Sequence, residues 1–320
     1  MKTFDARLAL VSVSVFAASA VCAADNPPEW AYPVNPPGFK PKPDDGTLRR
    51  VPGSSATFTL TQTRDRFFSP DWHPGEHPPQ PEVVARGRKP DVFACGFRHR
   101  ADGPGGPENS NLAGLPAAYV VQQMADFKSG ARKTSVPGRN IDLMISLAKA
   151  ATDAEVEAAA AYFSALKTRA VIRVVEGESV PRTYVTGWHF AAAGKGEQEA
   201  LGQRIVEMPE VFEHFESRDT HARFVAYVPP GSIQKGQALA TSGGAGKTVQ
   251  CASCHGPELK GVGAVPGIAG RSPTYLVRQL YDFKHGARAG TAGAQMKPTV
   301  ENLAVEDMIA LAAYIASLNP

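Results

Sequence analysis

The sequence Cys251-Ala-Ser-Cys-His255 has the spacing C-x-x-C-H, which is the attachment motif of a c-type haem. Two thiols three residues apart on one helical turn can each form a thioether with a haem vinyl group, and the adjacent histidine then lies beneath the iron. A zinc site would need a second C-x-x-C, which this sequence lacks. The motif therefore predicts haem c bound covalently by Cys251 and Cys254, with His255 as an iron ligand.

A haem in an electron carrier needs a second axial ligand, commonly a methionine, because a thioether sulfur stabilises ferrous iron. Met296 follows the motif, in the segment Gly293-Ala-Gln-Met-Lys-Pro298 ahead of a predicted terminal helix. Met308 lies within the apolar face of that helix, where its sulfur cannot easily reach an iron. We therefore expect Met296 to be the second ligand, rather than a methionine that fills a gap in the core.

The sequence contains an internal repeat. Residues 112–132 (LAGLPAAYVVQQMADFKSGAR) and 268–288 (IAGRSPTYLVRQLYDFKHGAR) are identical at 11 of 21 positions, at an offset of 156 residues. The same offset aligns Cys95 with the first motif cysteine and His99 with the motif histidine. The first copy then carries four additional residues, after which Met144 aligns with the later methionine ligand. The repeat predicts two modules of the same fold.

The first copy departs from the pattern at the haem motif, where Cys95-Gly-Phe-Arg-His99 has Arg98 in place of the second cysteine. Three interpretations remain open. Haem is held by one thioether from Cys95 with His99 and Met144 as ligands, haem is absent, or haem is bound without a covalent link. The retained residues favour a haem pocket, whereas Arg98 in place of the second cysteine argues against one. An empty pocket would have to collapse or destabilise the module.

The start of the chain, residues 1–23, has the pattern of a signal peptide, with a basic beginning, an apolar run and small residues before a cleavage site near Ala23. No later stretch approaches 18 uninterrupted apolar residues, so we expect no transmembrane segment in the mature chain. The formal net charge of +3 argues against a nucleic-acid partner. These features predict export to the periplasm, where covalent haem attachment fits.

The remaining composition predicts a mainly α-helical protein with four parts. Residues 24–80 are a Pro-rich extension, either a tether or a strap over a domain, and their aromatic residues favour the strap. Residues 81–168 and 231–320 are the two modules. Apolar residues at helical spacing predict helices over residues 119–130 and 153–167 in the first module and over residues 275–286 and 305–318 in the second. Residues 169–230 contain β-type apolar runs and form a β-rich connector, which either clamps the modules together or offers a docking face.

Several features outside the modules predict local structure. Residues 57–61 alternate threonine with phenylalanine and leucine, which predicts a short strand. His73 and His77 lie in a Pro-rich loop, where a proline and a glycine between them prevent a helix, so a metal site formed by this pair is not expected. His189 and His214 of the connector are expected to be structural or exposed rather than iron ligands.

The two modules resemble class I cytochromes c, and the pair is similar to the di-haem cytochromes of bacterial periplasms. The resemblance covers residues 251–320 throughout and residues 95–168 nearly so, while the signal, extension and connector lie outside it. It rests on C-x-x-C-H, on the pattern Tyr-x-x-x-Gln…Asp-Phe-x-x-Gly-x-Arg, on the methionine and on an Ala-Ala-Tyr helix. The resemblance implies two tandem class I cytochrome c modules, the first with a degenerate haem motif.

The same resemblance implies roles for individual residues. His255 would donate its outer N–H to the backbone carbonyl of Pro266, which fixes the ring. Tyr275 would lie on the helix over the haem. Arg288 would either reach a haem propionate or lie on a helix surface. In the first copy, Ser110 occupies the position that aligns with Pro266.

The function implied is electron transfer, without substrate turnover, because an iron with two axial ligands has no open position. The expected donor is a periplasmic dehydrogenase or a quinol-oxidising complex, and the expected acceptor is another cytochrome or an oxidase. Two alternatives remain open. The chain is a subunit of a dehydrogenase complex, with the extension and connector as binding surfaces, or it is a di-haem enzyme such as a peroxidase with an open iron in the first module.

Overall fold

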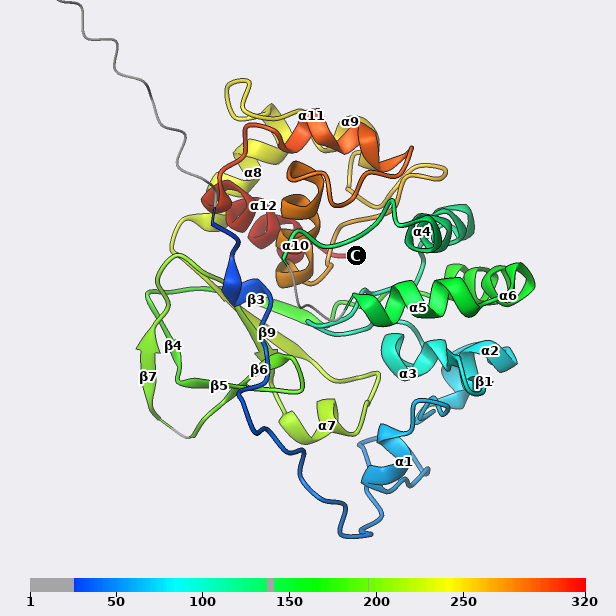
Figure 1. Cartoon of the computed structure of the whole chain (residues 1–320). Helices are drawn as coiled ribbons and strands as arrows, with labels where there is room; N and C mark the ends of the chain where they lie inside the picture. Colours follow the sequence, from blue (N-terminus) through cyan, green and yellow to red (C-terminus); the bar gives the residue numbers. More distant parts are fainter. Residues whose placement is uncertain (1–25, 137–140, 195) are drawn as a thin grey trace, which may run out of the picture.

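The computed structural model describes residues 26–136, 141–194 and 196–320, so the predicted signal peptide lies outside the described residues. The chain is mainly helical with small sheets, as the sequence predicts (Figure 1). Within the described part of the chain, no helix is both long and apolar enough to span a membrane. Two groups of helices lie above and to the right of the sheets in Figure 1, and the N-terminal extension runs past both.

The first helical group comes from residues 82–165. Its terminal helix begins at a capping box, in which Thr152 and Glu155 accept each other's backbone N–H groups. Phe163 and Tyr162 of that helix are buried in a core that also includes Val84. The elements are α2 (Glu82–Ala85), β1 (Gly87–Arg88), β2 (Val92–Phe93), α3 (Cys95–His99), α4 (Ala117–Ser129), α5 (Asp142–Ala150) and α6 (Asp153–Ala165).

The second helical group comes from residues 232–317 and is built around its last helix. Most residues of that helix are buried, because it is apolar on nearly every face and packs against neighbours on several sides. The elements are α8 (Ser232–Ser242), α9 (Ala252–His255), α10 (Pro273–Lys284), η3 (Gly293–Met296), α11 (Lys297–Val300) and α12 (Val305–Ser317).

Helices α8 and α12 approach closely at Gly236. We therefore expect a single added methyl group at this position to lower the stability of the fold. A Cβ at Gly236 would overlap the carbonyl of Ala310 and lie 2.8 Å from the Cβ of Tyr314. We expect Gly236→Ala to destabilise the fold by about 2–3 kcal/mol through overpacking. Denaturant unfolding checks this, with Gly194→Ala as the control, because nothing lies within 4 Å of a Cβ there. Equal unfolding midpoints for the two variants would contradict the packing argument.

Between the two helical groups, residues 172–228 contain most of the strands, and this connector contacts both groups. Ala226 and Val228 of its central strand are buried in the core of the second group. On the other side, Arg218 donates to the carbonyl of Phe97 in the first group at 2.7 Å. The sheet has the order β3-β9-β8, with β3 parallel to β9. The elements are β3 (Ile172–Glu176), β4 (Ser179–Pro181), β5 (Thr183–Thr186), β6 (His189–Ala192), β7 (Gln198–Ala200), β8 (Val206–Pro209), α7 (Phe212–Glu216) and β9 (Phe224–Val228).

The N-terminal extension has the contacts of a strap at its start. After the turn η1 (Glu29–Ala31), Ala31 and Tyr32 are buried in the second core, and Arg278 donates to the carbonyl of Ala31 at 2.9 Å. Further along, Trp72 is buried and donates from Nε1 to the carbonyl of Ser217 in the connector at 2.8 Å. The extension therefore joins elements that are distant in sequence.

The strand predicted at residues 57–61 is wrong. The structure has a helix, α1 (Leu60–Arg64), and only Phe58 forms a bridge, with Arg49. Thr59 and Gln62 form a capping box at the start of α1, with each side chain accepting the other's backbone N–H. These two hydrogen bonds favour a helical turn over the extended backbone that the alternation suggested.

Candidate functional site

In the second helical group, the motif histidine is held in one orientation. His255 closes the short helix α9, and its Nδ1 lies 2.8 Å from the carbonyl oxygen of Pro266. A carbonyl can only accept, so Nδ1 carries the proton and Nε2 keeps its lone pair. Burial lowers the pKa of His255, which keeps the ring neutral at physiological pH. The ring is therefore prepared to act as a metal ligand through Nε2.

The two motif cysteines and the predicted methionine lie at one edge of the second core. Cys251 is half-buried, and burial raises the pKa of its thiol to about 11, while Cys254 is exposed. Met296 ends the turn η3 and packs against the same core as Cys251. Neither cysteine forms a disulfide with another described cysteine, which leaves both thiols available for thioethers to haem.

In the first helical group, His99 is held in the same way. Its Nδ1 lies 2.8 Å from the carbonyl oxygen of Ser110, the residue that aligns with Pro266. Serine at position 110 in place of proline therefore does not prevent this hydrogen bond, because the acceptor is a backbone carbonyl, which any residue supplies. Burial lowers the pKa of His99 to about 4, so this ring is also neutral with a free Nε2 lone pair.

A cavity of about 230 Å³, lined by the first group together with α10 and the start of the extension, brings together the residues predicted from the repeat. Cys95, His99 and Met144 all line this cavity, although the methionine comes from α5, more than 40 residues away in sequence. Many of the other lining residues are apolar, including Val83, Leu112, Val120, Met124, Phe127, Leu147 and Phe163, and the rest include charged and polar side chains. A concave, largely apolar space with a few convergent polar groups is typical of a cofactor site.

Arg98, which replaces the second cysteine, also lines the cavity. Burial lowers the pKa of Arg98, and the nearby carboxylate of Glu108, another lining residue, opposes this shift. The guanidinium stays protonated at neutral pH, because an arginine pKa begins well above the physiological range. The first site therefore has a positive charge where the second has a thiol.

A network of arginine, glutamine and tyrosine side chains joins the two groups. Arg132 donates to Gln123 of its own module at 2.8 Å, and to Tyr275 and Gln279 of the other module at 2.9 Å each. Arg288 repeats the pattern in reverse. It donates to Gln279 of its own module at 3.1 Å and to Tyr119 and Gln123 of the other module at 2.7 Å each. Equivalent residues of the two repeat copies therefore make equivalent hydrogen bonds, and the contact between the modules is pseudo-symmetric.

This network places two of the predicted site residues. Tyr275 lines the cavity of the first module rather than only covering its own, and Arg288 is buried, so it is not a helix-surface residue. Arg132, Gln123 and Tyr119 are not among the site residues predicted from the sequence. Their signal was present, because each is identical in the two copies of the repeat.

The residues present fit a haem with its two carboxylates. The described hydrogen bonds of Arg132 and Arg288 all go to neutral groups, and the Nε of Arg288 is buried without a hydrogen-bond partner. Burial raises the pKa of Tyr275, but the two guanidinium groups outweigh it and lower that pKa to about 8. The interface therefore has an excess of positive potential that suits anionic propionates.

Comparison with known proteins supports the same class. The profile of the cytochrome c family matches residues 233–319. The thiosulfate dehydrogenase electron acceptor of Thiomonas intermedia is 30% identical over 63% of this chain and 67% of that protein. Cytochrome c4 of Stutzerimonas stutzeri is 24% identical over 71% of this chain and 86% of its own length.

A solved thiosulfate dehydrogenase from Marichromatium purpuratum superposes with a TM-score of 0.48 at 26% identity, over 72% of this chain and 38% of that chain. Because this score is below 0.5, the family rests on the sequence relatives and the motif. The chain belongs to the class I c-type cytochromes, which are electron-transfer proteins with haem c as their cofactor.

Proposed function

We propose that this chain is an exported two-module electron carrier that binds two haem groups. Residues 81–168 and 231–320 are its two cytochrome c modules, residues 24–80 and 169–230 fasten them together, and residues 1–23 direct export to the periplasm. In the second module, Cys251 and Cys254 hold haem c, with His255 and Met296 as iron ligands. Bound haem supplies an iron that cycles between Fe(III) and Fe(II), one electron at a time.

In the first module, we propose a second haem attached through Cys95 alone, with His99 and Met144 as iron ligands. The observation that carries this proposal is the shared cavity of these three residues, together with the His99–Ser110 hydrogen bond of 2.8 Å. A haem site needs a neutral histidine in a fixed orientation beside an apolar cavity, whereas a module without haem needs neither feature. Arg98 leaves one vinyl group without a thiol to react with.

The chain's own residues prepare both sites for electron transfer. The two carbonyls of Ser110 and Pro266 orient the ligand rings before any change of iron charge, which limits reorganisation. Arg132 and Arg288 supply positive charge at the contact between the modules and would pair with propionates. The methionine next to the first cavity favours two axial ligands over an open iron, which argues against the peroxidase alternative.

The electron count tests the two-module proposal. Anaerobic reductive titration of the exported protein, followed by its haem absorption, should consume two electrons per chain. A second expectation separates the carrier from an enzyme, because the oxidised protein should show low-spin spectra with no turnover of hydrogen peroxide. Consumption of one electron per chain would contradict the proposal of a haem in the first module. A high-spin component together with peroxide turnover would favour the enzyme alternative.

The electron donor that we propose is a thiosulfate dehydrogenase. The support is the Thiomonas relative, whose name states that role. The surface at the second motif suits brief docking, because Val249 and Val262 flank it with 48% and 59% exposure and Cys254 is exposed. In stopped-flow absorption, the dehydrogenase plus thiosulfate should reduce this protein faster than either does alone. Equal rates would contradict this donor while leaving the two-haem proposal intact.

Arg98→Cys should restore the complete motif in the first module and thus test the single thioether. The second thiol would react with the remaining vinyl group, so conjugation shortens and the pyridine haemochrome band of that haem shifts to the blue. Arg98→Ser is the matched control, because it removes the charge without supplying a thiol. Identical haemochrome bands in wild type, Arg98→Cys and Arg98→Ser would contradict the free vinyl group.

A further inference from the structure

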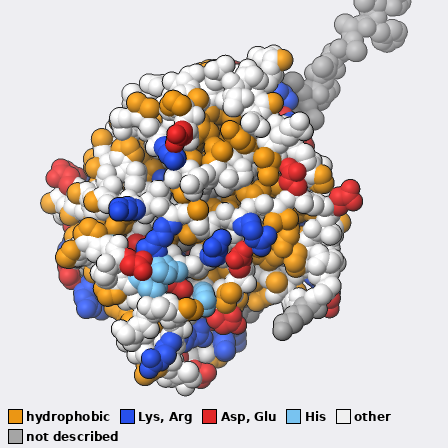
Figure 2. All heavy atoms as spheres, turned by 180° about the vertical axis from the view of Figure 1, so that it is seen from behind, with side chains coloured by type: hydrophobic (Ala, Val, Ile, Leu, Met, Phe, Trp, Pro, Cys, Tyr) orange, Lys and Arg blue, Asp and Glu red, His pale blue; other side chains and the backbone are white. Residues whose placement is uncertain are grey.

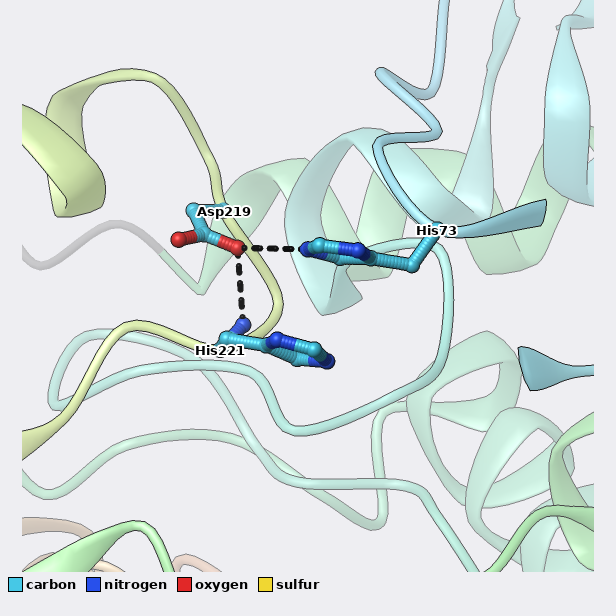
Figure 3. A group of neighbouring side chains, drawn as sticks. All are labelled: His73, Asp219 and His221. Atoms are coloured by element: carbon cyan, nitrogen blue, oxygen red, sulfur yellow. Dashed lines mark hydrogen bonds and ion pairs between the residues drawn. The ribbon is translucent and has the colours of Figure 1, made fainter. Parts of the chain in front are cut away.

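Two histidines that are far apart in sequence meet where the N-terminal extension contacts the connector. The rings of His73 and His221 stack, with centroids 3.8 Å apart and planes 8° apart. The carboxylate of Asp219 lies beside both, as Figure 3 shows. Its Oδ1 is 3.3 Å from His73 Nε2 and accepts the backbone N–H of His221 at 2.9 Å. One donor atom from each of the three side chains lies within 4.8 Å of the others.

The Asp219 carboxylate is buried, and the ion pairs that it forms among the described residues are both with imidazoles. Its side chain is 1% exposed, and its ion pairs are to the imidazoles of His73 at 3.3 Å and His214 at 3.8 Å. No lysine or arginine forms an ion pair with it among the described residues. A buried carboxylate needs compensating charge, and beyond these imidazoles the charge of Arg100 acts on it without a direct ion pair. A metal ion would therefore meet no lysine or arginine contact at the Asp219 oxygens among the described residues.

The distance between two of the donors is compatible with a shared metal ion as well as with a hydrogen bond. A charge-assisted N–H···O bond is normally about 2.7–2.9 Å long. Two donors bound tetrahedrally to one zinc ion, at about 2.0–2.1 Å each, lie about 3.3 Å apart. The distance from His73 Nε2 to Asp219 Oδ1 is 3.3 Å, which matches one edge of such a site. Imidazole nitrogen and carboxylate oxygen are both ordinary zinc donors.

We propose that His73, Asp219 and His221 bind one divalent transition-metal ion, with Zn²⁺ as the best match, and that Glu76 is a fourth ligand. One carboxylate oxygen of Glu76 is 2.9 Å from His221 Nε2 and also pairs with Arg169 at 2.5 Å. The other oxygen, 4.0 Å from His73 Nδ1, would therefore bind the ion. The lone pairs of two parallel rings cannot point to one ion, so binding requires the His221 ring to leave the stack. That movement is open to it, because its side chain is 38% exposed.

The surroundings separate this site from the other histidine on the same loop. His77 hydrogen-bonds with Asp71 at 3.1 Å and with the hydroxyl of Tyr162 at 3.1 Å. Its ring therefore connects the loop to helix α6 of the first module and lies outside the group of donors at the proposed metal site. Figure 2 shows histidine side chains at the surface in the view from behind, bordered by acidic and basic groups. An ion at the proposed site would fasten the loop of the extension to the loop after α7. It would therefore be a structural ion, separate from the haem iron.

The test is zinc binding by the full-length exported protein with its haem in place. After equilibration with Zn²⁺ and removal of free metal, elemental analysis should give one zinc per chain in addition to the haem iron. X-ray absorption at the zinc edge should show two imidazole ligands. His221→Ala should lower zinc affinity by at least 100-fold with little effect on the haem spectrum, because this side chain is partly exposed. Asp219→Asn should do the same.

His77→Gln is the matched control, because it changes a histidine of the same loop and should still bind one zinc. Zinc should also raise the melting temperature of wild type and of this control, but not that of His221→Ala. The proposal is overturned if wild type retains no zinc. It is equally overturned if His221→Ala and Asp219→Asn bind zinc as tightly as wild type, since the ion would then lie elsewhere.

Discussion

The double variant Cys251→Ala/Cys254→Ala should be exported with one haem instead of two. The substitution removes both thiols of the second module, so its haem has no covalent attachment. Cys95 is untouched and lines a separate cavity, so the first haem should remain covalently bound. Intact mass under denaturing conditions measures this directly, because only covalent haem stays with the chain. The remaining haem should have one unreacted vinyl group and therefore a red-shifted pyridine haemochrome band.

Cys95→Ala is the complementary variant, and it should keep the other haem with an ordinary c-type band. The two variants together assign each haem to one module without any need to separate the modules. A double variant that carries no covalent haem would show that Cys95 does not form a thioether. The second module should also lose stability without haem, because Cys251 and Met296 pack against its core at the place where haem would lie.

The second large effect concerns the methionine ligands. Met296→Ala should lower the reduction potential of the second haem by on the order of 100 mV, within the range of about 0.8 V over which axial ligands set haem potentials. The physical reason is the loss of a thioether sulfur that favours ferrous iron. Met144→Ala should have the corresponding effect on the first haem. Potentiometric titration of each variant, with the sulfur-to-iron charge-transfer band of the oxidised protein, provides the measurement.

The first cavity offers a demanding control for that prediction. Met124 of α4 lines the same cavity as Met144, so it is the rival sulfur ligand within reach of His99. In the second copy of the repeat its position is Leu280, which has no ligand atom. Met124→Leu should therefore leave the charge-transfer band and the potential of the first haem nearly unchanged. Loss of the band in Met124→Leu, with retention in Met144→Ala, would assign the ligand to α4 instead.

Much of the fold follows from local patterns in the sequence. The predicted helices over residues 119–130, 275–286, 153–167 and 305–318 correspond to α4, α10, α6 and α12 with small shifts at their ends. These helices have apolar residues at helical spacing, and several begin at caps, so local preference and burial agree. The prediction of a strand at residues 57–61 was wrong because the two hydrogen bonds of the capping box stabilise a helical start more than the short alternation of residues stabilises a strand.

The contacts between distant segments could not be predicted in the same way. The exchange of partners between Arg132 and Arg288 depends on how the two modules face each other, which no local pattern records. The structure also places Met144 in a helix, whereas its counterpart Met296 ends a short 3-10 turn. The meeting of His73 with His221 depends on the path of the extension across the connector. The sequence indicated only that His73 and His77 do not form a pair.

The measurement that tests the central claim most directly is the intact mass of the exported wild-type protein, with a pyridine haemochrome spectrum of the same sample. We predict a mass that includes two haem groups, and a spectrum that combines an ordinary c-type band with a red-shifted component from the haem held by Cys95. A mass that includes one haem, with only the ordinary band, would contradict a single-thioether haem in the first module.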